Sequence, residues 1–331
     1  MIIEELKYVI RNKLPFRAFI LSIKKSIIVI QHYISLQQLI RSHGKLDVCY
    51  CYWNNEICFA ATLLKGRGIS KVVSRVHRHD LYEYEKRDSY MPLKRQFINQ
   101  IDEIHTLSSE AMLYIIKTYS ASPSRISISP LGVRLPTQIS EVSKDGYLNV
   151  ISVSYCVDVK RIDRIIDGIF LYARHSQPTN IIWHHIGDGP LLRDLEEYAK
   201  SKFRELENVK YKFFGALSNG EVIDYYKENE VDVFINTSES EGVPVSIMEA
   251  MSFGIPAIAP DVGGMKFLVT DKTGLLLNAN GSPNDLAYAL GKLVKSNLKA
   301  KSFRIDVREF IKTNFNSDVN YERFITQLIT K

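Results

Sequence analysis

Two glutamates in the second half of the chain could take part in binding or catalysis, because one precedes an expected helix start and the other lies inside that helix. Seven residues separate Glu241 from Glu249. The apolar run 231–236 before them predicts a buried strand, Pro244 suits a first helical turn, and Gly254 suits the position just past a helix end. Free N–H groups at a helix start attract phosphate. A carboxylate would repel phosphate, so we expect Glu249 to hold neighbouring hydroxyl groups, such as those of a sugar.

The same stretch resembles the donor-site motif of retaining GT-B glycosyltransferases of glycosyltransferase family 4. The residues that carry the resemblance are Glu241-Gly242, Glu249-Ala250-Met251, Gly254-Ile255-Pro256 and Val262-Gly263-Gly264. Without these companions, two glutamates at this spacing would equally suit an amphipathic helix with one buried glutamate. The resemblance implies transfer of a sugar from a UDP- or GDP-linked donor to an acceptor hydroxyl, with retention at the anomeric carbon.

The resemblance also assigns roles to the motif residues. Gly242, Val243, Pro244 and Val245 would bind the donor through the helix start. Glu249 would hydrogen-bond donor hydroxyls, as its family counterpart holds the ribose. Glu241 would lie near the transferred sugar, as electrostatic support, as a positioning group or as a nucleophile.

A lysine in the segment 152–163 matches a second family position. Lys160 stands where family members have a lysine that contacts the donor diphosphate. A cation there would neutralise the charge of the leaving nucleoside diphosphate. Many relatives add an arginine six residues earlier, where this chain has Ser154, so Arg161 is either a substitute cation or a surface residue.

Glycine turns follow two expected strands of the second half. Gly187 and Gly189 surround an aspartate in a turn that the family uses near the nucleotide, although a lone Gly-Asp-Gly is otherwise only a turn. Gly215 opens a loop that lies by the nucleobase in relatives. Glycine at these points would let backbone approach a ligand closely.

One histidine of the first half matches a family position near the transferred sugar and the acceptor. His77 and Asp80 fit a pattern commonly written His-Gly-x-Asp, with Arg78 in place of the glycine. A histidine at a strand end is otherwise often structural. The resemblance therefore makes His77 a candidate catalytic residue on the acceptor side.

The elements that must position these residues read as two alternating α/β halves. The expected strands are 46–52, 72–76, 101–107, 126–129, 148–153, 180–186, 209–214, 231–236, 257–259 and 274–277. Helical spacing is expected for 161–174 and 302–330. Alternation of strands and helices predicts doubly wound domains, and the family's GT-B fold places two such Rossmann-like domains across a cleft. We expect an acceptor-side domain over 1–140, a nucleotide-sugar domain over 147–302, and a closing segment, 303–331, that crosses back.

The opening of the chain departs from the family. It begins with a charged helical segment instead of a strand and a glycine-rich turn, so the resemblance covers about residues 46–331 and the first domain is shortened. This departure leaves open a second function class, a truncated nucleotide-sugar-binding protein of little or no activity that acts through a partner. An epimerase or phosphorylase of the same fold is a third alternative.

Charge is concentrated in the first half of the chain. Residues 1–147 hold 21 Lys and Arg against 13 Asp and Glu, and the remainder holds 22 against 24. Near the start, basic residues alternate with apolar ones, which suits either a solvated helix face or a peripheral contact with the anionic inner face of a membrane. The residues are Arg11, Lys13, Arg17, Lys24 and Lys25 among Phe16, Phe19, Ile20 and Ile23. No uncharged apolar run reaches 18 residues, so we expect no spanning helix. No nucleic-acid motif accompanies the charge.

The remaining composition predicts an ordinary globular chain in a reducing compartment, the cytoplasm. Cys49, Cys51, Cys58 and Cys156 lack zinc-site spacing and are expected to be free thiols. The resemblance implies neither a metal nor another cofactor. It points to a lipid-linked or glycan acceptor in surface-polysaccharide or glycolipid assembly.

Overall fold

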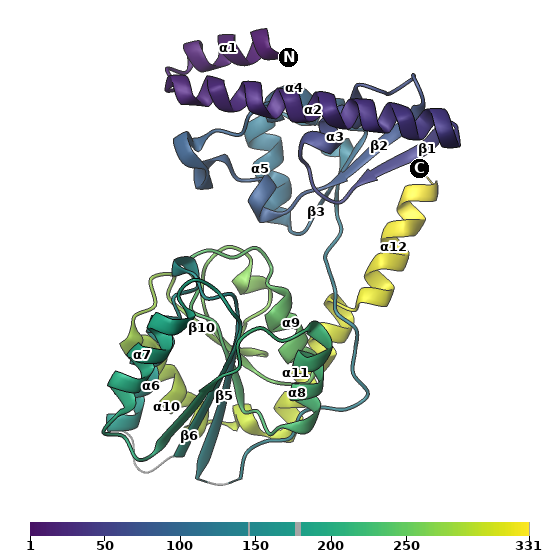
Figure 1. The fold of residues 1–331 in the computed structure, drawn as a ribbon. Helices are drawn as coiled ribbons and strands as arrows, with labels where there is room; N and C mark the ends of the chain where they lie inside the picture. The colour runs from purple at the N-terminus through teal and green to yellow at the C-terminus, as the bar shows by residue number, and fades with distance from the viewer. Residues whose placement is uncertain (145, 176–179, 331) are drawn as a thin grey trace. The chain divides into compact units, whose positions relative to one another are not determined.

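The computed structural model describes residues 1–144, 146–175 and 180–330. It forms two compact units, one of residues 1–130 with 322–331 and one of residues 131–321 (Figure 1). Each unit has a parallel sheet and a hydrophobic core of its own.

The first unit is built on four parallel strands in the order β1-β2-β3-β4. The strands are β1 (Leu46–Cys51), β2 (Ile69–Arg75), β3 (Glu103–Thr106) and β4 (Ile126–Ile128). The helices are α1 (Ile2–Arg11), α2 (Phe16–His43), α3 (Glu56–Thr62), α4 (Lys94–Phe97) and α5 (Ser109–Tyr119). Val72 and Val73 of β2 are fully buried, as β-branched residues in a central strand should be.

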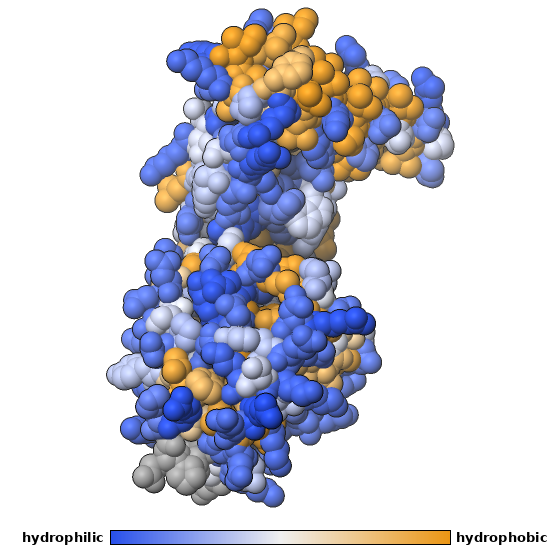
Figure 2. All heavy atoms as spheres, turned by 60° about the vertical axis from the view of Figure 1, so that its left-hand side comes forward, coloured by the Kyte–Doolittle hydropathy of each residue, from blue (hydrophilic) through white to orange (hydrophobic). Residues whose placement is uncertain are grey.

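Helix α2 buries small side chains near its start and larger apolar ones further along. Its buried residues are Ala18, Ser22 and Ser26, followed by Val29 and Leu36. Ser22 Oγ donates to Ala18 O at 2.8 Å and shares a hydrogen bond of 2.8 Å with the hydroxyl of Tyr90, so the buried hydroxyl is satisfied. Other large apolar residues of α2 face outward, namely Phe16, Ile20, Ile27, Ile30 and Ile34. Figure 2 shows apolar side chains gathered over this end of the first unit.

Within the described residues, α2 is the one helix long and apolar enough to cross a membrane by length and composition. The sequence contains no uncharged apolar run of this length because Lys24 and Lys25 interrupt it. Core helices of globular proteins and signal sequences share this length and composition, so α2 is not assigned as a membrane span on these properties alone.

The second unit has six parallel strands in the order β10-β9-β8-β5-β6-β7. The strands are β5 (Tyr147–Val153), β6 (Asn180–Ile186), β7 (Val209–Phe213), β8 (Val233–Ile235), β9 (Ala257–Pro260) and β10 (Gly274–Leu277). The helices are α6 (Ile162–His175), α7 (Leu192–Phe203), α8 (Asn219–Glu228), α9 (Val245–Ser252), α10 (Pro283–Lys295), α11 (Lys301–Asn314) and α12 (Ser317–Thr330), the last of which continues into the first unit. Strand β5 pairs with β6 on one side and β8 on the other, which makes the junction of β5 and β8 the topological switch point of the sheet.

All ten expected strands are present, with ends shifted by a few residues. The expected helix 302–330 is two helices, because the chain breaks between Phe315 and Ser317 to pair with Val133. The Val133 N–H donates to Phe315 O at 2.8 Å, and the Ser317 N–H donates to Val133 O at 3.0 Å. A side chain at the neighbouring Gly132 would lie 2.6 Å from Ser317 N, so the approach requires glycine.

The units divide at Pro130 and not at the expected position 140. Residues that follow Pro130 hydrogen-bond to the second unit. Arg304, which is 1% exposed, donates to Ser140 O at 2.6 Å, and the Ser140 N–H donates to Phe253 O at 3.0 Å. The polar bridge is thus part of the second unit.

Candidate functional site

Lys160 and Glu241 form an ion pair in the second unit. Their Nζ and Oε1 atoms are 2.5 Å apart, and the side chains are 24% and 11% exposed. Lys160 ends a short turn after β5, and Glu241 lies in the loop after β8. Because β5 and β8 are neighbours at the switch point, residues 81 positions apart meet at the carboxyl edge of the sheet.

Two residues of the β8 loop hold this pair in place. Asn236 Nδ2 donates to Glu241 Oε1 at 3.4 Å. Thr237 Oγ1 lies 3.2 Å from Lys160 O and 2.7 Å from Arg161 O, so it ties the β8 loop to the β5 loop. The geometry fixes the ammonium group of Lys160 at the carboxyl edge of the sheet, and an anion that binds there must compete with Glu241.

Arg161 belongs to a different group of charges. Its backbone φ is +49°, and its guanidinium pairs with Asp163 and Glu239. The hydrogen bond to Asp163 raises the pKa of Arg161 further. Ser154 donates its N–H to Ile186 O at 3.0 Å and is a backbone contact of the site. Arg161 is therefore held by carboxylates of its own unit and is not a free substitute for the second cation of the family.

Helix α9 follows Glu241 as expected from the sequence. Pro244 is its N-cap residue, and Val245 begins the helix, so the first amide groups of α9 have no partner in the preceding turn. Gly254 adopts a φ of +74° just past the helix end. Gly242 O accepts the N–H of Gly264 at 2.8 Å, which fixes the loop between Glu241 and the helix.

Glu249 points toward a different loop from Glu241. Asn219 Nδ2, at the start of α8, donates to Glu249 Oε1 at 2.6 Å. Burial raises the pKa of Glu249, and the bond from Asn219 opposes that shift. Among the residues described, no hydrogen bond or ion pair joins Glu249 to Lys160 or Glu241.

The predicted glycine turns bring loops into close contact. Gly187 and Gly189 have φ values of +148° and +149°. A Cβ atom would lie 1.8 Å from Ser154 O at Gly187 and 2.5 Å from Cys156 O at Gly189. Gly215, with a φ of +68°, accepts the N–H of Gly187 at 2.8 Å and has open space around its Cα. The loops after β5, β6 and β7 are thus joined through glycines.

His77 of the first unit is enclosed by aromatic rings. Its ring centroid lies 4.5 Å from that of Tyr52 and 4.4 Å from that of Trp53, and its Nε2 is 3.1 Å from Tyr52 O. Burial lowers the pKa of His77, so the imidazole is neutral at neutral pH. Asp80 accepts the N–H groups of His77 and Asn54 at 2.7 Å each, which makes it an organiser of two strand-end loops.

Several residues of these sites were not predicted from the sequence. Asn219, Asn236 and Thr237 contact predicted residues but lie outside the family motif as we read it. Tyr52 and Trp53 directly follow β1. Both could have been predicted as site residues, since aromatic residues at the end of a parallel strand often line a ligand site.

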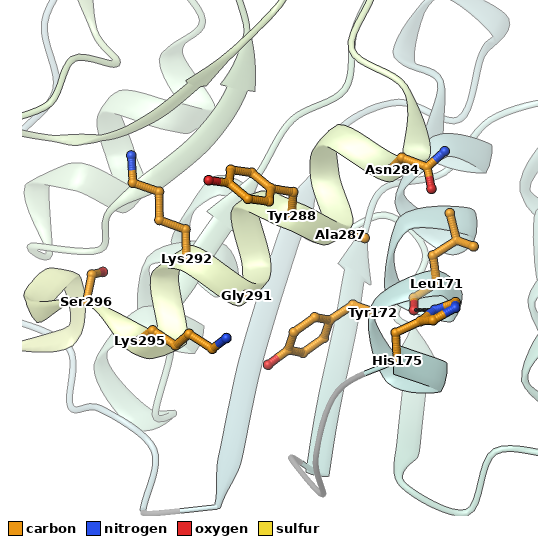
Figure 3. A pocket seen from close by; sticks show the side chains of 10 residues that line it. All are labelled: Leu171, Tyr172, His175, Asn284, Ala287, Tyr288, Gly291, Lys292, Lys295 and Ser296. Atoms are coloured by element: carbon orange, nitrogen blue, oxygen red, sulfur yellow. Dashed lines mark hydrogen bonds between the residues drawn. The ribbon is translucent and has the colours of Figure 1, made fainter.

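Two cavities lie in the second unit. One of about 640 Å³ lies between α6 and α10, is lined by Tyr172 and His175 on one side and by Lys295 on the other, and includes none of the predicted site residues (Figure 3). Another of about 590 Å³ is lined by Asp158 and Arg161. Among the residues that the structure covers, no group of three or more His, Cys, Asp or Glu is placed to hold a metal ion. The four cysteines are free thiols, as expected.

Solved structures share this fold. The lipopolysaccharide outer core galactosyltransferase WaaB, in its apo form, superposes with a TM-score of 0.72 at 20% identity, covering 91% of this chain and 80% of that one. Anabaena HepE in complex with UDP gives 0.70 at 16% identity, covering 90% and 82%. The expected α/β architecture with two parallel sheets is confirmed, and it is the GT-B fold.

Curated relatives match shorter stretches. The O-antigen biosynthesis glycosyltransferase WbnH of Escherichia coli is 36% identical over 110 residues, which are 33% of this chain and 28% of that protein. The alpha-monoglucosyldiacylglycerol synthase of Streptococcus pneumoniae is 26% identical over 206 residues, 57% of this chain and 45% of that protein. The chain thus spans less than half the length of either relative. The model of the glycosyl transferases group 1 matches residues 137–310, more than half of the chain. The chain belongs to the glycosyl transferases group 1 family.

Proposed function

We propose that this protein is a retaining glycosyltransferase of family 4 that moves a sugar from a nucleotide-sugar to an acceptor hydroxyl in surface-polysaccharide or glycolipid assembly. The observation that carries the proposal is the Lys160–Glu241 pair at the switch point of the second sheet. Family membership and the roles named for WbnH and the pneumococcal synthase support it.

The leaving diphosphate would bind between Lys160 and the start of α9. Amide groups of Gly242, Val243 and Val245 offer donors there, with Pro244 shaping the turn, and the helix dipole adds positive potential. In the free protein Lys160 is paired with Glu241, so an arriving diphosphate competes with the carboxylate for the ammonium group. As negative charge builds up on the leaving group, that ammonium group stabilises it.

Glu241 and Glu249 would take different parts of the donor. Glu241 stays close to Lys160 and would face the transferred sugar, where a carboxylate stabilises an oxocarbenium-like state. Glu249, held by Asn219 near the loop that follows β7, would accept hydrogen bonds from donor hydroxyls. The turns at Gly187, Gly189 and Gly215 would border the nucleotide.

His77 would lie on the acceptor side. Its neutral imidazole and its aromatic neighbours Tyr52 and Trp53 suit contact with a sugar ring or a hydroxyl group. Asp80 would act through the backbone of His77, as a positioning residue.

The positive field of Lys160 and α9 leads us to propose transfer without a metal. Turnover should then be equal with and without EDTA, and a requirement for added Mg²⁺ or Mn²⁺ would contradict this part of the proposal.

A thermal-shift screen of nucleotides and nucleotide-sugars tests the function first, since a ligand of the folded chain raises its melting temperature. UDP is the first candidate because HepE is similar in fold and binds it, and GDP is the second. The best donor is then incubated with candidate acceptors, and the anomeric configuration of the product is read by NMR. Binding without turnover for every acceptor would favour the alternative, an inactive nucleotide-sugar-binding protein.

We also propose that the chain is cytoplasmic and contacts an anionic membrane surface through α1 and α2. Apolar side chains are exposed on both helices, with Ile3 69%, Ile10 68% and Phe16 72% exposed. Arg11, Lys13 and Lys24 are exposed beside them and, among the described residues, take part in no ion pair. An apolar face flanked by cations is the pattern of an interfacial helix.

Vesicle sedimentation tests this surface. Binding should be stronger to anionic than to neutral vesicles and should weaken with salt. The double variant Ile27→Ser, Ile34→Ser should reduce binding, while Leu113→Ser, an exposed leucine of α5, should not. Equal binding to both kinds of vesicle would remove the membrane from the proposal.

A further inference from the structure

A cavity of the first unit lies at the carboxyl ends of β1 and β2, where parallel sheets place their ligands. Its volume is about 560 Å³, which is within the usual range for small-molecule sites. One wall comes from α2, through Leu21, and another from α3, through Phe59. Trp53, Met91 and Pro92 complete an apolar lining.

The polar lining of this cavity is dominated by cations. Lys25, Lys86 and Arg87 all contribute to it. Lys25 is paired with Glu56 at 2.6 Å, and Lys86 Nζ lies 3.1 Å from His79 Nδ1, a neighbour that carries no negative charge. Burial lowers the pKa of Lys86, the carboxylates of Glu85 and Asp80 oppose that shift, and Lys25 adds a smaller effect that lowers the pKa. A negatively charged ligand would relieve this crowding of like charges.

The lining also contains a buried lysine that is held by carbonyl groups. Lys94 is 1% exposed, and its ammonium group donates to Asn54 O and Asp80 O. Of the two carboxylates in the lining, Glu56 is already paired with Lys25, and Asp80 accepts two backbone N–H groups. The positive charge of this wall therefore exceeds the negative charge available within it.

A buried amide oxygen of the lining lacks a partner. Asn54 is 1% exposed, and its Nδ2 donates to Ser74 Oγ at 3.0 Å. Its Oδ1 accepts no hydrogen bond from any residue that the structure describes. An unsatisfied buried acceptor costs about 1–3 kcal/mol, and this oxygen adds a partial negative charge behind the cavity wall without being accessible from the cavity.

We propose that this cavity binds an amphiphile that carries a phosphate group, with the phosphate at Lys25, Lys86 and Arg87 and the apolar portion against Leu21, Trp53 and Met91. The amphiphile would serve as the acceptor of the sugar, and this role rests on the proposed glycosyltransferase function. His77 lies next to this site, since its ring contacts Trp53.

Tryptophan fluorescence can report the binding directly. The chain has two tryptophans, and Trp183 is fully buried in the second unit, whereas Trp53 is 42% exposed in the cavity lining. The probe is dodecyl phosphate, titrated below its micelle-forming concentration. Dodecyl maltoside, with the same chain and no charge, and inorganic phosphate, with the charge and no chain, are the matched ligands.

The expected result is a fluorescence change with dodecyl phosphate at concentrations at least about tenfold lower than with either matched ligand. The double variant Lys86→Gln, Arg87→Gln should weaken dodecyl phosphate binding about tenfold or more, since charge-assisted hydrogen bonds are lost. Lys117→Gln, on an exposed position of α5 outside the cavity, should bind like the wild type. The Ile27→Ser, Ile34→Ser variant should also bind normally, which excludes capture of the probe by the outer face of α2.

Two outcomes would overturn the proposal. If dodecyl maltoside binds as tightly as dodecyl phosphate and the lysine–arginine variant is unaffected, the cavity does not select phosphate. If inorganic phosphate binds as tightly as dodecyl phosphate, the apolar lining has no part in recognition. UDP binding, measured on the same proteins, tests the donor site of the second unit separately. If UDP does not bind to the wild type, the proposed donor site is wrong, whereas the result for the cavity still holds.

Discussion

Removal of Lys160 should weaken nucleotide binding, whereas removal of the charge of Glu241 should not. The two side chains are largely buried and their charged atoms lie 2.5 Å apart. Lys160→Ala removes a charge-assisted contact to the diphosphate, worth about 1.5–3 kcal/mol, and should weaken UDP or GDP binding by roughly 10- to 150-fold. Glu241→Gln removes the carboxylate that competes for the ammonium group, so the nucleotide should bind as tightly as to the wild type or more tightly.

Isothermal titration calorimetry with the nucleoside diphosphate measures both effects, and a transfer assay runs in parallel. In the double variant Lys160→Ala, Glu241→Gln, binding should be stronger than in Lys160→Ala alone, because no unpaired carboxylate then faces the diphosphate. Lys200→Ala, an exposed lysine of α7, is the matched control and should bind normally. An unchanged dissociation constant for Lys160→Ala, or weaker binding for Glu241→Gln, would refute the reasoning.

Glu249→Ala should lower transfer on the order of 100-fold or more while the thermal midpoint stays close to that of the wild type, and normal turnover would defeat its assignment. Because burial raises the pKa of Glu249 above 4.5, the folded chain holds the proton of this carboxyl group more tightly than the unfolded chain. The free energy of unfolding should therefore fall as pH rises from about 4.5 through the folded-state pKa. Urea unfolding at pH about 4 and about 7 should show a smaller decrease for Glu249→Gln than for the wild type. Gly187→Ala should destabilise the chain by about 2–4 kcal/mol, since its Cβ would lie 1.8 Å from Ser154 O. Gly220→Ala, in α8, would place its Cβ 4.0 Å from Ser218 Oγ and should be neutral or stabilising, and equal effects at the two glycines would contradict the loop geometry.

The strands of both sheets could be predicted because their residues are apolar and β-branched over short runs. Val72 and Val73 illustrate this, since both are fully buried in the middle of a parallel strand. The two ends of α9 could also be predicted, because proline restricts the backbone at Pro244 and glycine permits the positive φ that Gly254 adopts past the helix end.

Contacts between residues distant in the sequence could not be predicted. Lys160 and Glu241 each matched a family position, but their ion pair depends on the order of β5 and β8 in the sheet, which no local pattern encodes. The hydrogen bond from Asn219 to Glu249 likewise joins two helices that follow different strands. In both cases sequence reasoning supplied the residues and the topology supplied the contact.

The first helices show a different limit. Apolar residues occur on every face of α2, so hydrophobic periodicity could not tell which face packs inward. The inward face carries the small residues Ala18, Ser22 and Ser26 and then Val29 and Leu36, while Ile27 remains exposed, and this division follows from tertiary packing. The aromatic enclosure of His77 is also a tertiary feature, produced by the meeting of the loops after β1 and β2.

A crystal structure of the protein with UDP or GDP, whichever stabilises it more, tests the central claim most directly. The account predicts the diphosphate within hydrogen-bond distance of Lys160 Nζ and of the amide groups of Gly242–Val245, with Glu249 facing the hydroxyls of the ribose. A diphosphate bound to any other part of the second unit, with the Lys160–Glu241 pair undisturbed, would contradict it.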